Sequence, residues 1–401
     1  MSSRAGFPIF DADNHFYETT DALTKYLPAD RKGAVEYVQD GGRTKIALRG
    51  VISEYLPNPT FDRIGRPGAQ EQYFKMGNPE NKTPRELVGQ GIDCPPAFRN
   101  AFDRLPHMDE LGIDYALMMP TLVSLIEERM RDDPDLCHDV IHAFNQWMVE
   151  EWPFVHEGRI FAAPYITPFL VDRAVAELEW VLEHGAKTVL MRPAPAWGHE
   201  GPRSFGLPEF DPFWRLVEES GIVIAMHVGD SGYDRYYNEW HGVTGEMSHF
   251  GRPVPFKQSQ LFNHRPIQDT ITSLICHGTF WRFPKAKMAL IENGGGWVPE
   301  HLAYLDHVAL KSPGEYEMTP TETFKQNVWV QMNHEEDPRP VIDCLGIDRV
   351  LFGSDYPHTE GIADPLSYLN DIADLPEEDQ RKIMGGNMLA LFGMADAPSV
   401  V

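Results

Sequence analysis

Residues 170–191 read LVDRAVAELEWVLEHGAKTVLM, a stretch that combines an amphipathic helix with a short apolar strand. Apolar residues from Val171 to Leu182 recur every three or four positions, which places them on one face of a helix. Gly185 follows this pattern and is a typical helix terminator. The run Thr188–Met191 then has the length and composition of a buried strand. The stretch predicts a helix that packs on a parallel sheet.

The same alternation of a short apolar run and a helix-like segment recurs along the chain. Continuous apolar strands separated by helices are typical of a parallel sheet that is covered by helices. Eight such units predict an α/β fold, the (β/α)8 TIM barrel. The eight candidate strands are Pro8–Phe10, Tyr115–Met119, Ile160–Ala163, Thr188–Met191, Ile222–Met226, Lys287–Ile291, Val328–Gln331 and Arg349–Phe352.

Two long segments interrupt this alternation. Residues from about 40 to 102 are rich in Gly, Pro, Asn and charge and show no clear period. They follow the first strand, so we expect an insertion that covers the barrel mouth. A second long loop runs from Gly229 to about Pro266, after the fifth strand. Because α/β barrels exceed the usual domain length, we expect residues 1–401 to form one domain.

Composition excludes several classes of protein. Hydrophobic residues make up 42% and charged residues 24%, as in ordinary globular proteins, and the formal net charge is −25. A field of that sign repels nucleic acid and anionic membranes. The four cysteines are far apart, which argues against a disulfide framework or a cysteine zinc site. Residues 1–15 lack the apolar core of a signal peptide, and no apolar run spans a bilayer. We therefore expect a cytoplasmic protein with no nucleic-acid or membrane partner.

Polar residues follow most of the candidate strands. In a TIM barrel the chemistry gathers at the carboxyl ends of the strands, so these residues are candidates for a site. The first strand ends in Asp11-Ala-Asp13-Asn-His15. The later ends carry Arg192, His227, Glu292-Asn293, Asn333-His334 and Ser354-Asp355-Tyr-Pro-His358.

Four of these residues have the chemistry of metal ligands. Asp13 and His15 lie two apart, so their side chains point the same way along a strand. His227 and Asp355 can converge on them from the fifth and eighth strands, as nitrogen and oxygen ligands of a divalent metal. A single histidine at a strand end is more often structural. Four candidates at three ends of one barrel favour a metal site.

The segments FDADNHFYE (10–18), IAMHVG (224–229), FWRFPKAKMALIENGGGW (280–297) and LFGSDYPH (351–358) together resemble the amidohydrolase-related (amidohydrolase 2) family of the amidohydrolase superfamily. That branch includes metal-dependent hydrolases and aminocarboxymuconate-semialdehyde decarboxylase-like proteins. The resemblance covers nearly the whole chain apart from the insertion. It implies a TIM barrel whose metal ligands are Asp13, His15, His227 and Asp355, and it suggests a homodimer.

This sequence departs from the decarboxylases of the family at one position. Their sixth strand is followed by a histidine that donates a proton, whereas this chain has Glu292 there. The departure favours a hydrolase that cleaves an ester, thioester, lactone or amide of a small organic acid. The alternative is a nonoxidative decarboxylase of an aromatic or unsaturated acid, since a glutamate near a metal can also protonate carbon. A non-catalytic, metal-free barrel is the third hypothesis.

The hydrolase hypothesis assigns catalytic roles to Asp355 and Glu292. A divalent metal lowers the pKa of bound water to about 7, and Asp355 would take the water's proton and pass it to the leaving group. Glu292 would serve as a second acid or base, or would bind a second metal. We expect one transition metal, zinc first, with manganese or iron as alternatives because such a ligand set accepts all three.

Four further residues are candidates for substrate binding: Arg192, Trp297, His334 and His358. Arg192 suits a carboxylate or phosphate because its guanidinium pairs in a bidentate manner. An ion pair with a neighbouring acid explains Arg192 equally well. His334 and His358 would either contact the small-molecule substrate or orient a metal ligand.

Overall fold

A computed structural model describes residues 5–242, 244, 255–256, 259 and 264–400. Much of the second long loop, between Gly242 and His264, lies outside these described residues. Eight parallel strands form the centre of the molecule. Seven coincide with the predicted strands to within one residue at each end, whereas the first, predicted at Pro8–Phe10, runs from Phe10 to Phe16 and includes the polar residues Asp11–His15. The eight strands are β1 (Phe10–Phe16), β7 (Tyr115–Pro120), β8 (Ile160–Ala162), β9 (Thr188–Met191), β12 (Val223–His227), β13 (Lys287–Ile291), β14 (Val328–Gln331) and β15 (Val350–Leu351).

The eight strands close into a barrel. Hydrogen-bonded pairing gives the orders β1-β7-β8 and β9-β12-β13-β14-β15. Leu190 bridges the gap between β8 and β9, since its N–H donates to Pro164 O at 2.8 Å and its carbonyl accepts from Ile166 N at 2.9 Å. On the other side, Ala12 N donates to Phe352 O at 3.0 Å and joins β1 to the end of β15. The TIM-barrel prediction is therefore confirmed.

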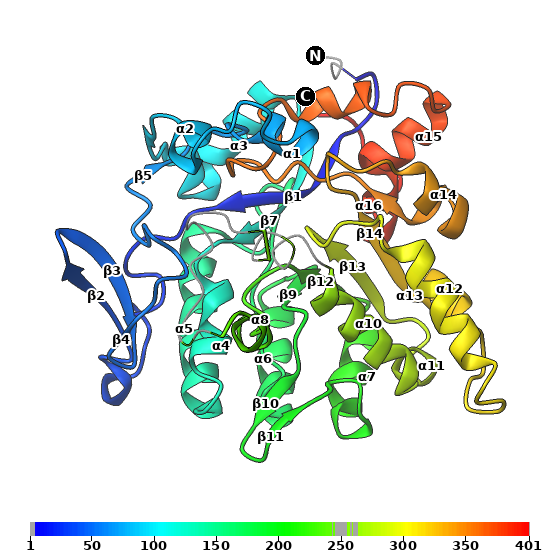
Figure 1. The fold of residues 1–401 in the computed structure, drawn as a ribbon, viewed down its shortest axis with the longest axis horizontal. Helices are drawn as coiled ribbons and strands as arrows, with labels where there is room; N and C mark the ends of the chain where they lie inside the picture. Colours follow the sequence, from blue (N-terminus) through cyan, green and yellow to red (C-terminus); the bar gives the residue numbers. More distant parts are fainter. Residues whose placement is uncertain (1–4, 243, 245–254, 257–258, 260–263, 401) are drawn as a thin grey trace.

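Helices surround the strands and bury their apolar faces (Figure 1). Those that connect successive strands are α3 (Ala101–Leu111), α4 (Ile126–Arg129), α5 (Pro134–Glu151), α6 (Val171–Glu183), α7 (Asp211–Ser220), α10 (Arg265–Cys276), α11 (Thr279–Arg282), α12 (Val298–Ala309), α13 (Pro320–Asn327) and α14 (Arg339–Leu345). The chain ends with α15 (Glu377–Arg381) and α16 (Asn387–Leu391). The face of α6 predicted to be apolar is buried at Ala174, Leu178 and Val181. The core is continuous from the barrel interior to these helices.

The insertion after β1 contains regular structure that the sequence pattern did not reveal. It holds β2 (Val35–Asp40), β3 (Arg43–Leu48), β4 (Val51–Ile52), β5 (Arg63–Ile64), α1 (Glu71–Met76), α2 (Pro84–Val88) and β6 (Ile92–Asp93). Strands β2 and β3 form a hairpin around Gly41-Gly42, a strong turn signal. The predicted start of the insertion, at about residue 40, falls inside this hairpin. The insertion thus begins before Val35 and ends where α3 starts.

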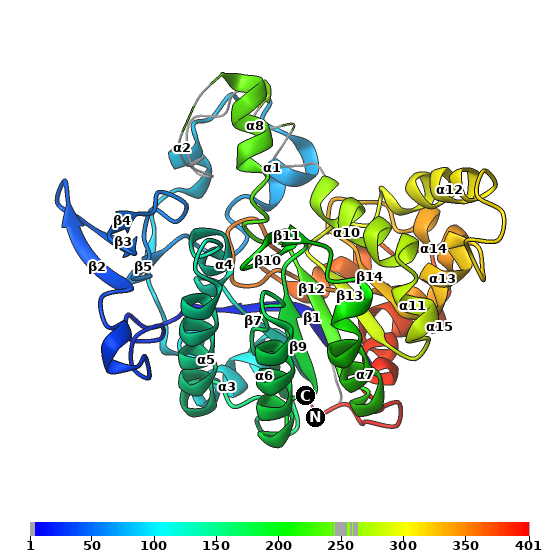
Figure 2. The same cartoon turned by 90° about the horizontal axis from the view of Figure 1, so that it is seen from below.

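Only part of the insertion lies at the end of the barrel that carries the strand termini. The sheet β2-β3-β4 lies at the side of the barrel, at the left edge of Figure 1. Figure 2 shows α1 and α2 beyond the strands together with α8 (Asp234–His241), opposite the two chain termini. Gly68 N donates to His358 O at 3.0 Å, and Gln70 N donates to Thr359 O at 2.7 Å. The segment around α1 therefore rests on the loop after β15.

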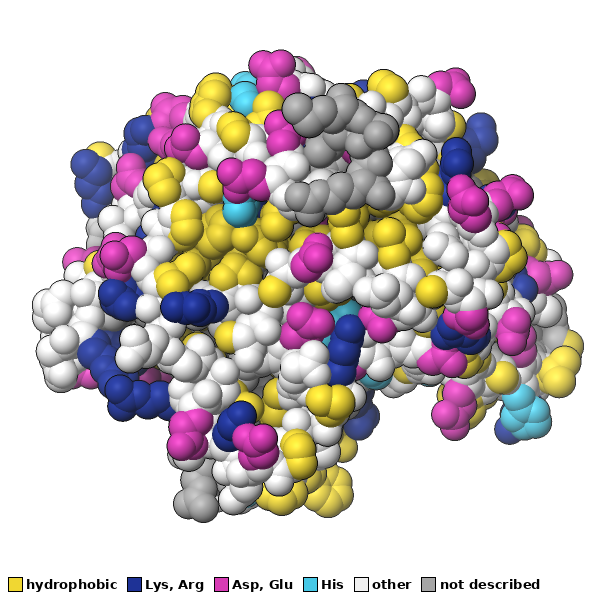
Figure 3. Space-filling view, turned by 90° about the horizontal axis from the view of Figure 1, so that it is seen from above, with side chains coloured by type: hydrophobic (Ala, Val, Ile, Leu, Met, Phe, Trp, Pro, Cys, Tyr) yellow, Lys and Arg dark blue, Asp and Glu magenta, His cyan; other side chains and the backbone are white. Residues whose placement is uncertain are grey.

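The exterior carries both signs of charge. Acidic and basic side chains are interspersed around the face drawn in Figure 3, and hydrophobic side chains gather across its middle.

A small hairpin of β10 (Ala196–Gly198) and β11 (Gly201–Arg203) follows β9. Within the described ranges, no helix combines the length and the hydropathy that a membrane crossing requires.

Candidate metal centre

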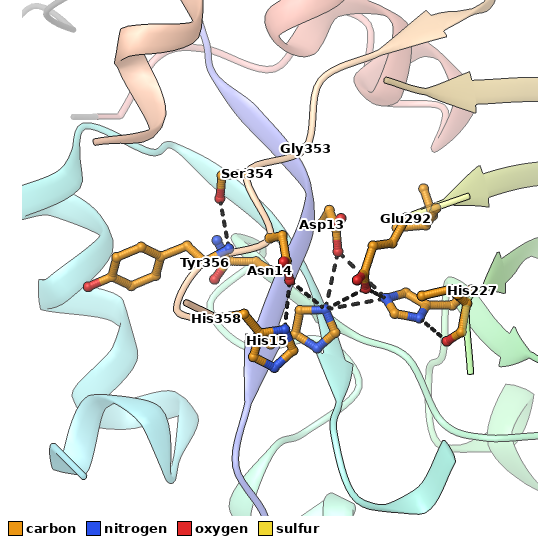
Figure 4. A network of polar contacts seen from close by, with 12 residues as sticks. Asp13, Asn14, His15, His227, Glu292, Gly353, Ser354, Tyr356 and His358 are labelled. Atoms are coloured by element: carbon orange, nitrogen blue, oxygen red, sulfur yellow. Dashed lines mark hydrogen bonds and ion pairs between the residues drawn. The ribbon is translucent and has the colours of Figure 1, made fainter. Parts of the chain in front are cut away.

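Asp11 joins the first strand to the eighth. Its carboxylate accepts hydrogen bonds from Ser354 N at 2.9 Å, Ser354 Oγ at 2.5 Å and Asn14 Nδ2 at 2.6 Å. Figure 4 shows Ser354 and Asn14 at this junction. These bonds hold the carboxyl end of β1 against the segment that contains Asp355. Asp11 thus supports the site and does not itself enter it.

Four side chains from three strands converge next to this junction (Figure 4). One donor atom of each of Asp13, His15, His227 and Glu292 lies within 4.8 Å of the others. Nε2 of His15 is 3.3 Å from Oδ1 of Asp13, and Nε2 of His227 is 3.2 Å from Oε2 of Glu292. Asp13 and His15 lie within β1, whereas His227 ends β12 and Glu292 follows β13. The predicted convergence of strands 1 and 5 is present, and strand 6 joins it.

Asp355 and His358 lie on the other side of His15. Oδ1 of Asp355 is 3.4 Å from His15 Nε2 and 2.7 Å from His358 Nδ1. The imidazoles of His15 and His358 face each other with centroids 4.0 Å apart. Nε2 of His358 is 3.3 Å from Oγ1 of Thr121, which comes from the end of β7. Asp355 is therefore a second carboxylate beside the cluster, and His358 holds it in place.

Local backbone geometry sets the directions of the two outer carboxylates. Glu292 has a φ of 52° and Asp355 a φ of 54°, a left-handed conformation that is uncommon for residues other than glycine. Such conformations cost about 1–3 kcal/mol and often occur at functional sites. Gly353 precedes Asp355 and lies so close to β1 that a Cβ there would collide with the side chain of Asp13. Glycine is thus required for β15 to approach Asp13.

Burial and charge perturb the ionisation of every member of the cluster. The pKa of Glu292 is raised to about 8, through burial first, with smaller upward contributions from Asp13 and Glu360 against the opposing effect of His227. The pKa of Asp355 rises well above its usual range, through burial first and then through Glu292 and Asp13. Burial lowers the pKa of His15 to about 3, with His358 as the next cause. The site holds more negative charge than its own histidines can neutralise.

Asp13 shows that a cation fits this site. Burial raises its pKa, but the nearby imidazoles of His15 and His227 outweigh burial and leave the pKa below its usual range. Its two carboxylate oxygens are buried, and neither has a hydrogen-bond partner among the residues that the structure describes. Buried carboxylates without donors are costly unless a cation binds them. Aspartate, glutamate and histidine are suitable ligands for a divalent transition metal.

Arg192 follows β9 as predicted, but its guanidinium is engaged by buried acids. Nε is 2.8 Å from Oε2 of Glu127, and Nη1 is 3.3 Å from Oε2 of Glu128 and donates to the carbonyl of Asp230. Its remaining nitrogen, Nη2, is buried and has no partner among the described residues. These contacts match the alternative ion-pair explanation of Arg192. They also fix the start of the loop after His227.

His334 and Trp297 lie apart from the four-residue cluster. His334 Nε2 donates to the carbonyl of Glu360 at 2.8 Å, and its ring lies 6.4 Å from that of Phe74 in the insertion. Trp297 precedes α12, and its indole N–H donates to the carbonyls of Asn293 and Gly294, both at 3.1 Å. The substrate-binding roles of these residues stay predictions.

Three residues near the centre were not among the sequence candidates. Glu360 adds a carboxylate near Asp355, Thr121 contacts His358, and Tyr17 packs against the ring of His358 at 5.8 Å. Tyr17 could have been found from the sequence, because it continues the two-residue spacing of Asp13 and His15 just past the first strand. Glu360 and Thr121 lie in loops, where no periodicity indicates the direction of a side chain.

Comparisons with known proteins agree with this architecture. The family model described as Amidohydrolase matches residues 11–394. The crystal structure of an amidohydrolase from Mycobacterium avium subsp. paratuberculosis K-10 superimposes with a TM-score of 0.90 at 36% identity, over 96% of this chain and 98% of that one. This similarity includes the insertion, because it extends over almost the full length of both chains.

Two decarboxylases are more distant matches. The chain is 27% identical over 202 residues to 2-amino-3-carboxymuconate-6-semialdehyde decarboxylase from Dictyostelium discoideum, which is 47% of this chain and 49% of that protein. The match thus spans about half the length of that curated relative. A dihydroxybenzoic acid decarboxylase from Polaromonas sp. JS666, solved with manganese and the inhibitor 2-nitroresorcinol, has a TM-score of 0.62 at 16% identity over 98% of this chain and 99% of that one. At that identity the likeness concerns the fold alone.

Proposed function

Because this chain belongs to the amidohydrolase family, we propose that it is a metal-dependent nonoxidative decarboxylase of an aromatic or unsaturated acid. The observation that carries the proposal is the buried cluster of Asp13, His15, His227 and Glu292, with Asp355 at its side. The match to a decarboxylase of a carboxymuconate semialdehyde supports this function above hydrolysis, which the sequence alone favoured. The substrate is a small molecule that enters from the carboxyl ends of the strands.

We assign Asp13, His15, His227 and Asp355 to hold one divalent metal. Zinc is the metal that this ligand set favours, and manganese is the metal in the Polaromonas decarboxylase. When bound, the metal supplies an electrophilic centre for the substrate carboxylate and an oxygen next to it. Asp11 and His358 keep the ligands in position through their bonds to Ser354 and to Asp355.

Glu292 is the proton donor in this proposal. Decarboxylation breaks the bond between a substrate carbon and its carboxylate; carbon dioxide leaves, and the electron pair that remains on carbon forms a new bond to a proton. The side chain of Glu292 is 25% exposed, against 11% for Asp355 and 0% for Asp13. Glu292 is thus the carboxyl group of the site that a substrate at the mouth meets first. It replaces the histidine that the family's decarboxylases use.

Hydrolysis of an ester, thioester, lactone or amide is the second candidate, and the glutamate at position 292 favours it. In that reaction Asp355 would accept a proton from the attacking water and return it to the leaving group. The same ligands would hold the metal, so the two reactions differ in the products that they form. The non-catalytic barrel requires neither metal nor turnover.

The insertion contributes one wall of the substrate site in this proposal. Phe74 in α1 contacts the ring of His334, and residues 68–70 bond to the loop that carries His358. Lys75 pairs with Asp371 at 3.0 Å and holds α1 against the barrel. These contacts support a role for residues 61–76 as a cover over part of the mouth.

Product analysis of the metal-loaded protein tests the proposal. We would incubate it with 2,6-dihydroxybenzoate, 5-carboxyvanillate and a set of aryl esters and lactones. Release of carbon dioxide, with loss of the substrate carboxylate, supports the decarboxylase, and formation of an acid plus an alcohol supports the hydrolase. Elemental analysis of protein purified without added metal supplies the control. A protein that holds no metal and takes none up contradicts both reactions and supports the non-catalytic barrel.

A further inference from the structure

Tyr17 extends the functional side of the first strand. Side chains two residues apart on a strand point the same way, so Asp13 and His15 share one side of β1. Tyr17 directly follows the last residue of this strand, Phe16, and its ring reaches the same surroundings. Contacts agree with this geometry, because the rings of His15 and Tyr17 both pack against His358, at 4.0 and 5.8 Å. Tyr17 lies where β1 leaves the barrel, beside Asp355 and Glu360.

The ring of Tyr17 is fixed, and none of the residues that the structure describes bonds to its hydroxyl. The ring is enclosed by Phe61 at 4.7 Å, Phe98 at 6.4 Å and His358, and only 6% of the residue is exposed. The backbone N–H donates to Phe98 O at 2.9 Å. Within the described part of the chain, no group forms a hydrogen bond with the phenol oxygen. This oxygen is not among the fully buried polar atoms of the described residues that lack a partner, so it borders open space and is available to a ligand.

Phe61 holds Tyr17 from the insertion. It is buried and has a φ of 50°, a left-handed conformation that is a true outlier for a bulky side chain. Conformations of this kind persist only where the surroundings enforce them. The ring of Phe61 lies at 31° to that of Tyr17. A continuous series of ring contacts therefore links the insertion to the metal centre, from Phe61 through Tyr17 and His358 to His15.

The carboxylates near the metal centre limit which protein groups can recognise a substrate besides the metal. No lysine or arginine in the described ranges pairs with Asp13, Glu292, Asp355 or Glu360. Arg192, the cation that the sequence offered for a carboxylate, is engaged by Glu127 and Glu128. A second acidic group on the substrate would face these carboxylates without a counter-charge. Recognition beyond the metal therefore depends on neutral donors such as the phenol of Tyr17.

We propose that Tyr17 is a specificity-determining residue, whose phenol donates a hydrogen bond to an uncharged hydroxyl oxygen of an aromatic substrate at the metal centre. Phe61 is the positioning residue that keeps the phenol in place. The inference rests on the proposed function, since it requires an aromatic ligand at a loaded metal site. A site built to bond a hydroxyl rejects an analogue that lacks it, because its own polar group is then left unpaired.

Two nitrophenols test this role without knowledge of the natural substrate. Manganese-loaded protein would be titrated with 2-nitroresorcinol and with 2-nitrophenol, which lacks one hydroxyl, and binding followed by the absorbance of the probe. Tyr17→Phe should raise the Kd of 2-nitroresorcinol about tenfold and leave that of 2-nitrophenol within about twofold. Tyr115→Phe is the matched control, because it removes a hydroxyl that bonds to Pro398 O at 2.7 Å, outside the site. It should change neither Kd.

Phe61→Leu separates a positioning role from general damage. It should weaken 2-nitroresorcinol selectively, and the double variant should bind no more weakly than Tyr17→Phe alone. Equal weakening of both probes, or of neither, overturns the proposal, as does loss of manganese from Tyr17→Phe. Wild-type protein that holds manganese but binds neither probe contradicts this ligand class and leaves the metal site intact. Wild-type protein that holds no metal contradicts the proposed function itself.

Discussion

Nε2 of His15 and Nε2 of His227 lie 3.3 Å apart, and both face Oδ1 of Asp13, at 3.3 and 3.6 Å. Nδ1 of His227 donates to the carbonyl of Val228 at 2.7 Å and therefore carries the proton of the neutral ring. Nε2 of the neutral ring then has a lone pair and no proton. A lone pair and a carboxylate oxygen that face each other in a buried site repel unless a proton or a cation lies between them. Their arrangement explains why a metal would stabilise this fold.

Metal removal should therefore destabilise the protein. A ligand that binds only the folded state stabilises it by about 4 kcal/mol when its concentration is a thousand times its Kd. We expect dialysis against a chelator to lower the Tm by several degrees, and zinc or manganese to restore it. The measurement is thermal unfolding followed by circular dichroism. In the variant His227→Asn the chelator should have little effect, and an equal effect there would locate the metal elsewhere.

The two outer carboxylates should differ in what their loss does. Asp355→Asn is expected to lower metal content together with turnover, because Asp355 is assigned as a ligand next to His15. Glu292→Gln is expected to keep the metal and to lose turnover by a factor of about 10²–10⁴, the usual contribution of general acid catalysis. Elemental analysis and product formation are measured on the same preparations. If Glu292→Gln lost the metal and Asp355→Asn kept it, Glu292 would be the ligand, as its place in the four-residue cluster also allows.

Arg192 should matter more for stability than a surface arginine does. Arg192→Ala leaves Glu127 buried without its cation, whereas Glu128 keeps Arg131 and Arg235, and loss of one partner from a buried pair costs about 3–5 kcal/mol. The matched control is Arg339→Ala, which removes exposed pairs with Asp337 and Asp374 and should cost less than about 1 kcal/mol. Denaturant unfolding compares the two. Equal losses would mean that the buried network contributes no special stability.

Glu18 should make stability depend on pH. It is buried, its Oε1 accepts from Leu122 N at 2.7 Å, and burial raises its pKa from 4.5 to about 7. Between these two pKa values, the folded state therefore keeps a proton on Glu18 that the unfolded state has already released. Stability falls as pH rises through this window, by about 3 kcal/mol in total.

Glu18→Gln removes this proton and keeps a carbonyl acceptor for Leu122. The Tm of the variant, relative to the wild type, should increase from pH 5 to pH 8. Thermal unfolding at several pH values measures the difference. A difference that stays constant across the range would show that Glu18 does not titrate in it.

Local sequence determined the elements and the direction of some site residues. The eight apolar runs became the eight barrel strands because continuous burial of a parallel strand leaves a pattern that needs no knowledge of its neighbours. Barrel closure then places every strand end at one mouth, which is why Asp13, His15 and His227 could be grouped from their positions alone. The hairpin at Gly41-Gly42 is likewise indicated locally, by a glycine pair typical of a two-residue turn.

Only the tertiary structure decided which side chains from different strands and loops contact each other. Glu292 lies against His227, Asp355 against His358, and Arg192 against Glu127 because strand register and loop path bring these distant residues together. Side-chain periodicity reports which way a residue points within one strand, and it carries no information on the register between strands. The contact of Phe61 with Tyr17 depends in addition on a left-handed residue in an insertion without periodicity. The sequence thus determined the barrel and the chemistry at its mouth, and the packing of the chain decided which groups meet there.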